Sequence, residues 1–273
     1  MTWWGHATVA VEDGGTSVLT DPVLRNRLAH LWRRRGPTPR PPHPPDAVVI
    51  SHLHADHCDL ASLRMVPRRS TMVVPRGAAA FLRSRLGADR PFVELSPGEQ
   101  TTVGAMTIRA VPADHHGHRM PRSKLFAQPV GYLLSGTRTT WFAGDTGLFD
   151  GMDGFGAVDL ALVPVWGWGF NLGPGHLDPS GAAEAVRRVA PAWAVPIHWG
   201  TLWPVGCQRI RPDRFHGPGE EFAGLAAGAA PATQVRVLAP GGTLALDDEP
   251  VTPHDGGGAQ AARVTEAVHV EGE

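Results

Sequence analysis

Residues 51–57 read Ser-His-Leu-His-Ala-Asp-His, so four side chains that can bind a metal ion stand within six positions. They follow a short apolar run of the kind found in buried strands. In an extended segment, side chains two positions apart point the same way, so His52 and His54 can converge on one ion. The turn that follows can direct Asp56 and His57 toward a second ion. This stretch therefore predicts a metal site at the end of a strand.

Three further candidate ligands follow other apolar runs of the sequence. His115, Asp145 and His198 each stand just past a predicted strand. Zinc takes about four ligands and leaves a position open to water at catalytic sites, so the 51–57 motif needs ligands from elsewhere. Because a sheet can bring strand ends to a common edge, we expect these three side chains to complete the site.

Predicted strands and helices are mixed in both halves of the chain, which is typical of an α/β domain whose helices cover its sheets. Strands are expected at 8–12, 17–20, 47–50, 71–74, 107–111, 130–134, 139–142, 160–163, 193–197, 234–238 and 243–246, and helices at 76–86, from Asp178 or Ser180 to about 189, and from 220 to about 229. Asp13-Gly14-Gly15 predicts a hairpin between the first two strands. We expect one domain, residues 1–248, followed by a poorly ordered tail at 249–273.

Composition excludes several classes of protein. The 25 Lys and Arg residues nearly balance the 26 Asp and Glu residues, and a net charge of −1 argues against a nucleic-acid binder. Two cysteines cannot form a disulfide framework for a chain of this length. The sequence shows neither a secretory leader nor an apolar run long enough to span a bilayer. We therefore expect a cytoplasmic protein without a transmembrane segment; a homo-oligomer is left open.

The motifs together resemble the metallo-β-lactamase superfamily. Within it, they resemble the branch that contains ascorbate-6-phosphate lactonase-like proteins and N-acylphosphatidylethanolamine-hydrolysing phospholipase D. Besides residues 51–57, the resemblance rests on Trp-Gly-His-Ala-Thr at 4–8, Phe-Ala-Gly-Asp-Thr-Gly at 142–147, His-Leu-Asp-Pro at 176–179 and Ile-His-Trp-Gly-Thr at 197–201. It implies an αβ/βα four-layer sandwich, in which two mixed β-sheets carry helices on their outer faces and two metal ions lie at one edge.

The resemblance also implies two metal sites joined by a bridging carboxylate: His52, His54 and His115 for the first ion, Asp56, His57 and His198 for the second, and Asp145 between them. Gly117 and His118 stand where the branch usually has Ser and Gly, so His116 and His118 remain alternatives to His115. His115 keeps both the Pro-Ala-x-His lead and the spacing to Arg119. Nitrogen and oxygen ligands suit two divalent ions, with Zn²⁺ favoured over Mn²⁺ or Fe.

These features predict a dinuclear metal-dependent hydrolase that uses a metal-bound hydroxide on an ester-like bond. Two cations roughly 3.5–4 Å apart lower the pKa of a shared water and stabilise the negative charge that develops. Asp56 and His176 are the expected catalytic residues, with His176 serving the leaving group without binding metal. A phosphodiester is the leading substrate class, followed by a sugar-phosphate lactone. The alternatives are a catalytically silent metal sensor and a nuclease of the superfamily.

Three loops are expected to surround the site: residues 25–45, which are rich in Arg and Pro, 166–176, and 203–219. Their aromatic groups and arginines favour a small-molecule or lipid-like anionic substrate. Replacing Arg33, Arg34 and Arg35 with Ser is expected to raise KM. Asp21 is a candidate for holding a ligand histidine, whereas His6 is assigned to packing or hydrogen bonding.

Overall fold

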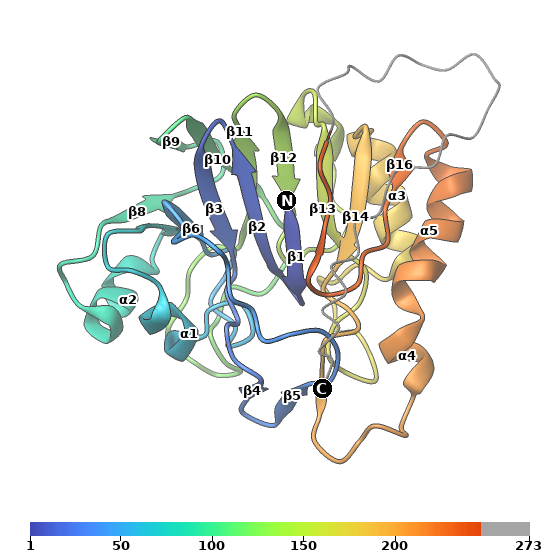
Figure 1. The fold of residues 1–273 in the computed structure, drawn as a ribbon, viewed down its shortest axis with the longest axis horizontal. Coiled ribbons are helices and arrows are strands. Elements are labelled where there is room, and N and C mark those ends of the chain that lie inside the picture. The colour runs from blue at the N-terminus through green and yellow to red at the C-terminus, as the bar shows by residue number, and fades with distance from the viewer. Residues whose placement is uncertain (247–273) are drawn as a thin grey trace, which may run out of the picture.

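Two seven-stranded sheets face each other in the centre of the molecule (Figure 1). This computed structural model describes residues 1–246. The tail expected at 249–273 lies outside the described residues, so the domain boundary at 248 stays a prediction.

Both sheets mix parallel and antiparallel strands. The order in the first sheet is β17 (Gly242–Thr243), β1 (Thr2–Gly5), β2 (Thr8–Asp13), β3 (Thr16–Thr20), β6 (Ala47–Val49), β7 (Thr71–Pro75) and β8 (Phe92–Leu95). The order in the second is β16 (Gln234–Val235), β14 (Trp193–Ile197), β13 (Leu160–Pro164), β12 (Thr139–Phe142), β11 (Val130–Ser135), β10 (Met106–Pro112) and β9 (Gln100–Val103). The predicted hairpin joins β2 to β3, where Asp13 pairs with Thr16.

Helices cover the outer faces of the two sheets (Figure 1). On the first sheet, α1 (Leu60–Met65) and α2 (Ala79–Leu86) pack against alternate side chains of β6 and β7. On the second, α3 (Pro179–Val189) and α5 (Pro218–Ala229) pack together over β13 and β14, with η1 (Met152–Phe155) and α4 (Pro212–His216) nearby. The remaining faces of the sheets meet in one large apolar core, which continues into buried side chains of α3 and α5. The predicted αβ/βα sandwich is therefore confirmed.

The loop expected at residues 25–45 contains structure that the sequence did not indicate. Its strands β4 (Arg27–Leu28) and β5 (Leu31–Arg33) pair with β15 (Leu202–Pro204) in a small third sheet. The Arg33 guanidinium is buried there and donates to the carbonyl oxygens of Trp4 (2.8 Å) and Val23 (3.1 Å). The assignment of Arg33 to a substrate-capturing loop is thus wrong, because its charge is used to fasten this sheet to the domain.

Gly5, at the end of β1, permits that attachment. Its φ is +102°, and a Cβ atom on it would lie 2.8 Å from the Arg33 guanidinium and 2.6 Å from the Thr201 methyl group. A side chain would therefore displace the third sheet from the domain. Within residues 1–246, no helix has the length and apolar character needed to cross a membrane.

Candidate metal centre

The candidate ligands gather at one edge of the two sheets. The 51–57 motif follows β6, His115 follows β10, Asp145 follows β12 and His198 follows β14. The glycine before Asp145, Gly144, has a φ of +63°, and a Cβ atom on it would lie 2.6 Å from the Ser51 Cβ. Only glycine lets the end of β12 approach the histidine motif this closely.

Three ring nitrogens form the first cluster. His54 Nδ1 lies 3.0 Å from His52 Nε2 and 3.1 Å from His115 Nε2. The opposite nitrogens of the outer two rings already have partners: His115 Nδ1 contacts the Gly175 carbonyl oxygen at 2.7 Å, and His52 Nδ1 contacts the Ser51 hydroxyl at 3.0 Å. A carbonyl oxygen only accepts, so in neutral His115 the proton is on Nδ1 and the Nε2 lone pair faces the cluster.

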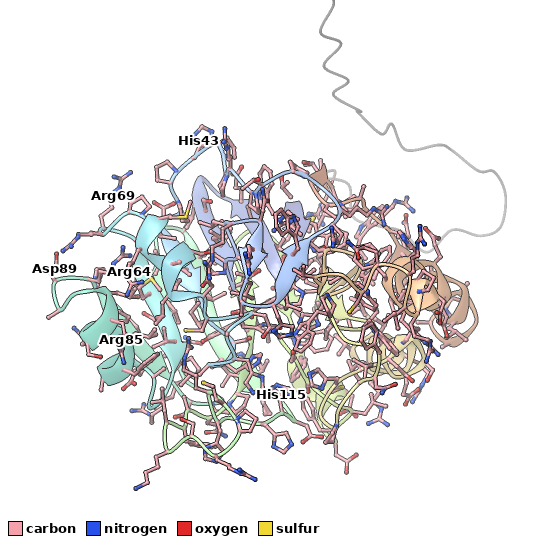
Figure 2. The ribbon with its side chains drawn as sticks, turned by 90° about the horizontal axis from the view of Figure 1, so that it is seen from below. His43, Arg64, Arg69, Arg85, Asp89 and His115 are labelled. Atoms are coloured by element: carbon pink, nitrogen blue, oxygen red, sulfur yellow. The ribbon has the colours of Figure 1, made fainter. Side chains whose placement is uncertain are left out.

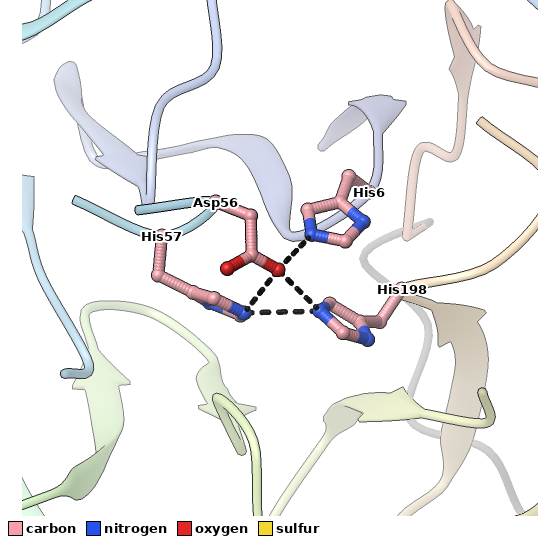
Figure 3. Close-up of side chains that lie close together, drawn as sticks. All are labelled: His6, Asp56, His57 and His198. Atoms are coloured by element: carbon pink, nitrogen blue, oxygen red, sulfur yellow. Dashed lines mark hydrogen bonds and ion pairs between the residues drawn. The ribbon is translucent and has the colours of Figure 1, made fainter. Parts of the chain in front are cut away.

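Figure 3 shows a second cluster, formed by Asp56, His57 and His198. It lies next to the first, since the ring centroids of His52 and His57 are 4.1 Å apart. His57 Nε2 and His198 Nε2 lie 2.9 Å apart, and Asp56 Oδ2 lies 3.6 and 3.7 Å from them. His57 Nδ1 donates to Asp21 Oδ2 (2.7 Å), and His198 Nδ1 donates to the Trp166 carbonyl oxygen (2.8 Å). Two neutral imidazoles held in this way turn lone pairs toward each other, which is unfavourable unless a cation lies between them.

Asp145 connects the two clusters. Its Oδ2 lies 3.1 Å from His57 Nε2 and its Oδ1 lies 3.3 Å from His198 Nε2, while His115 is near enough to share an ion with it. The Oδ1 atom is buried and has no hydrogen-bond partner among residues 1–246. A buried carboxylate oxygen without a partner is costly, so this atom fits a metal ligand. All seven predicted ligands are therefore brought together in an arrangement that suits metal ions.

The pKa directions follow from burial and from the mixture of charges. Burial lowers the pKa of His52 well below its usual range, and His57 lowers it further. Burial likewise lowers the pKa of His115 to about 4. Burial opposes ionisation of Asp145, but His198 and His57 outweigh it and hold the pKa of this carboxyl well below normal. Burial also lowers the pKa of His57, but Asp145 and Asp56 outweigh it and raise the pKa of this imidazole well above normal. A metal ion bound at His57 would therefore have to displace its proton, because metal binding requires the neutral imidazole.

His176 lies at the edge of the clusters. Its Nε2 is 3.4 Å from Asp145 Oδ2, and its side chain is 24% exposed. Burial lowers the pKa of His176, but the hydrogen bond to Asp145 outweighs it and the pKa is raised. Of the alternatives to His115, His116 and His118 are exposed and belong to neither cluster. The structure thus gathers His115 with the other candidate ligands and leaves both alternatives outside.

A cavity of about 540 Å³ opens onto the clusters. Candidate ligands and His176 form its floor, and its apolar walls include Trp168, Leu172 and Met120. The predicted rim is only partly right: residues 166–176 contribute most of one wall, His30 alone comes from residues 25–45, and no residue of 203–219 lines the cavity. Two arginines of that last loop are engaged elsewhere: Arg211 pairs with Asp213, and Arg214 lies over the Trp166 ring.

A second cavity, of about 630 Å³, lies between the ends of α1 and α2, away from His115 (Figure 2). Two of its arginines donate to backbone carbonyl oxygens, and a third pairs with a carboxylate. Arg64 donates to the Arg85 carbonyl oxygen (3.2 Å), Arg90 donates to the Val66 carbonyl oxygen (2.7 Å), and Arg68 pairs with Asp89. Cations at helix C-termini stabilise the exposed carbonyl groups, which accounts for this cluster.

His6, which was expected to pack or to hydrogen-bond, makes a hydrogen bond to Asp56 (2.9 Å), but its place beside the candidate ligands was not predicted. It joins Asp56, His57 and His198 in one group of potential ligands (Figure 3). Burial lowers the pKa of His6 to about 3, with His198 adding to the effect. A signal for this role was present in the Trp-Gly-His-Ala-Thr motif, but its 50-residue separation from Asp56 gave no reason to connect the two.

Comparison with known families matches residues 16–199 to the beta-lactamase superfamily domain. The matched residues are more than half of the chain. The chain belongs to the metallo-β-lactamase superfamily. A UPF0173 metal-dependent hydrolase of Methanopyrus kandleri is 32% identical to this chain over 228 residues. The alignment covers 81% of this chain and 92% of that protein.

Two further proteins are similar to this chain. The N-acyl-phosphatidylethanolamine-hydrolyzing phospholipase D 1 of Caenorhabditis elegans is 30% identical over 231 residues, which cover 75% of this chain and 64% of the worm protein. A solved metallo hydrolase from Ignicoccus hospitalis has a TM-score of 0.69 at 23% identity, covers 91% of this chain and 98% of that one, and shows the same fold. The chain is thus a metal-dependent hydrolase of the metallo-β-lactamase superfamily, as predicted.

Proposed function

We propose that this metal-dependent hydrolase holds two divalent cations, Zn²⁺ in the first instance, and cleaves a phosphodiester whose substituents include an apolar group. The observation that carries the proposal is the convergence of imidazole lone pairs and carboxylate oxygens on two adjacent positions at the floor of one cavity. His52, His54 and His115 would hold one ion, Asp56, His57 and His198 the other, and Asp145 both. When bound, the two ions would supply an activated water and stabilise negative charge on the phosphoryl group.

The other residues of the site would position these groups and serve the substrate. Asp21 orients His57 through Nδ1, and the Trp166 carbonyl oxygen does the same for His198. His176 projects into the cavity beside Asp145 and would protonate the leaving group as its bond to phosphorus breaks. Asp56 would fix the second ion in relation to the attacked group.

The cavity supports a substrate with an apolar part. Trp168 packs against Leu28, Leu31 and Leu202 of the third sheet and lines the cavity. Aromatic and aliphatic walls stabilise an apolar substituent by removing its surface from water. The name of the worm relative, which describes hydrolysis of a phospholipid phosphodiester, supports the same substrate class.

A matched pair of substrates tests this assignment. Metal-reconstituted protein is assayed on p-nitrophenyl phosphodiesters that differ only in a methyl or a long alkyl substituent, and on a lactone and a β-lactam. We expect turnover of the phosphodiesters, with kcat/KM larger for the alkyl ester. Preferred turnover of the lactone would contradict the phosphodiester assignment. No turnover on any substrate, with two ions bound, would favour the metal sensor.

Replacing Trp168 with Ala is expected to reduce kcat/KM for the long alkyl ester by roughly 10- to 100-fold, because burying such a side chain contributes about 1.5–3 kcal/mol. The methyl ester should be little affected. Trp32→Ala is the matched control, since Trp32 is exposed and does not line the cavity. Equal losses on the two esters would show that Trp168 supports the fold and does not contact the substrate.

A further inference from the structure

We propose that His6 is a positioning residue for the ion that Asp56, His57 and His198 would hold, acting from the turn between β1 and β2. The inference rests on the proposed function in requiring a metal ion at this position. It adds a residue that follows β1 to a site otherwise built from residues that follow β6, β10, β12 and β14. Both the side chain and the backbone of His6 contact residues of this site.

The side chain of His6 fixes the carboxylate of Asp56. Its Nε2 lies 2.9 Å from Asp56 Oδ2, the same oxygen that faces His57 and His198 (Figure 3). An ionised carboxylate only accepts hydrogen bonds, so the Nε2 hydrogen of His6 is donated to it. Asp56 is 14% exposed and lies on a turn rather than on a strand, so this bond selects one direction for its carboxylate.

The backbone of His6 fixes His198. The His6 carbonyl oxygen accepts from the His198 amide (2.9 Å), and the His6 amide donates to Thr201 Oγ1 (2.9 Å). Both histidines have positive φ values, 53° for His6 and 66° for His198. Such conformations cost about 1–3 kcal/mol each for residues other than glycine and concentrate at functional sites. A backbone hydrogen bond thus joins the two strained residues at the position where the His198 ring points toward His57.

The direction of the hydrogens distinguishes His6 from a ligand. His57 and His198 donate outward, to Asp21 and to the Trp166 carbonyl oxygen, and so present lone pairs to the centre. His6 does the reverse, because its hydrogen points at the Asp56 oxygen. The His6 and His198 rings also pack at a centroid distance of 3.9 Å, which keeps the His6 ring in this orientation. Ligating carboxylates are commonly held by such an outer hydrogen bond.

Two variants separate hydrogen bonding from packing. His6→Gln retains an N–H donor at about the reach of Nε2, whereas His6→Met fills the space of the ring without a donor. Neither changes the backbone bonds to His198 and Thr201. The affinities of the two ions are measured by competition with a chromogenic chelator, and the Co²⁺ absorption spectrum of each variant is recorded.

We expect His6→Met to lower the affinity for one of the two ions by roughly 10- to 100-fold, which is the usual effect of removing an outer hydrogen bond. The affinity for the other ion should not change. His6→Gln should recover most of that loss and keep the Co²⁺ spectrum of the unmodified protein. Unchanged affinities in folded His6→Met would overturn the inference. Equal losses of affinity in both variants would overturn it as well. A changed Co²⁺ spectrum in His6→Gln would also overturn it, because that change would identify His6 as a ligand.

His43→Met is the matched control, because His43 is exposed and lies far from His115 in Figure 2. It should leave both affinities unchanged. The unmodified protein is titrated first. If it binds no ion, the proposed function itself fails; if it binds two and the His6 variants match the control, only the positioning role of His6 is wrong.

Discussion

Replacing His176 with Asn is expected to lower kcat by roughly 10²–10⁴, the usual contribution of a positioned acid or base, while metal content and fold are retained. The geometry gives the reason. His176 Nε2 lies 3.4 Å from the bridging candidate Asp145, and Nδ1 faces the carbonyl oxygens of Gly173 (3.1 Å) and Pro174 (3.2 Å), so the ring is oriented into the cavity. Steady-state kinetics and elemental analysis of the same preparation measure both quantities.

His116→Asn serves as the matched control for His176→Asn. His116 is exposed and outside both ligand clusters, so its replacement should change neither kcat nor metal content. Loss of an ion in His176→Asn would make His176 a ligand, and a kcat near that of the unmodified protein would make it structural. Loss of an ion in His116→Asn would instead favour that residue over His115.

Replacing Asp21 with Asn is expected to lower the affinity for the ion beside His57 by roughly 10- to 100-fold. This is the usual effect of removing a carboxylate that accepts a hydrogen bond from a ligand histidine. Asp21 is fully buried and accepts from His57 Nδ1 (2.7 Å) and from the Ser51 amide (2.7 Å). An asparagine has one acceptor oxygen and adds an NH₂ group, so it cannot satisfy both donors in the same way. Chelator competition measures the change.

Asp46→Asn is a suitable control for the Asp21 variant. Asp46 accepts from the Ser17 amide at the exposed surface, so it tests loss of a carboxylate away from the metal centre. If Asp21→Asn binds both ions as tightly as this control does, His57 does not depend on Asp21 for its orientation.

The sequence allowed the strands that carry the site to be predicted because their apolar runs are continuous. The strand expected at 193–197 is β14 (Trp193–Ile197), and that expected at 139–142 is β12 (Thr139–Phe142). Buried strands of a mixed sheet have little freedom in composition, so their ends, and the side chains that follow, can be located. Asp178, expected as one candidate helix cap, accepts from the Gly181 amide at the start of α3.

Features that depend on contacts between distant segments could not be predicted in the same way. Helix α1 has only six residues and was missed; its cap, Asp59, is held by Arg25 from the loop before β4. Arg33 stands in a run of arginines that reads as solvent-exposed, yet its guanidinium is buried against backbone carbonyls. The contact between His6 and Asp56 likewise exists only once the sheets have assembled.

The number of metal ions bound per chain is the most direct test of the dinuclear site. Protein purified without chelator, or reconstituted with Zn²⁺ and freed of excess metal, is analysed for metal ions per chain by elemental analysis. Seven convergent candidate ligands, with Asp145 placed between the two clusters, predict two ions per chain. A folded protein that carries no metal and gains none on reconstitution would contradict the account.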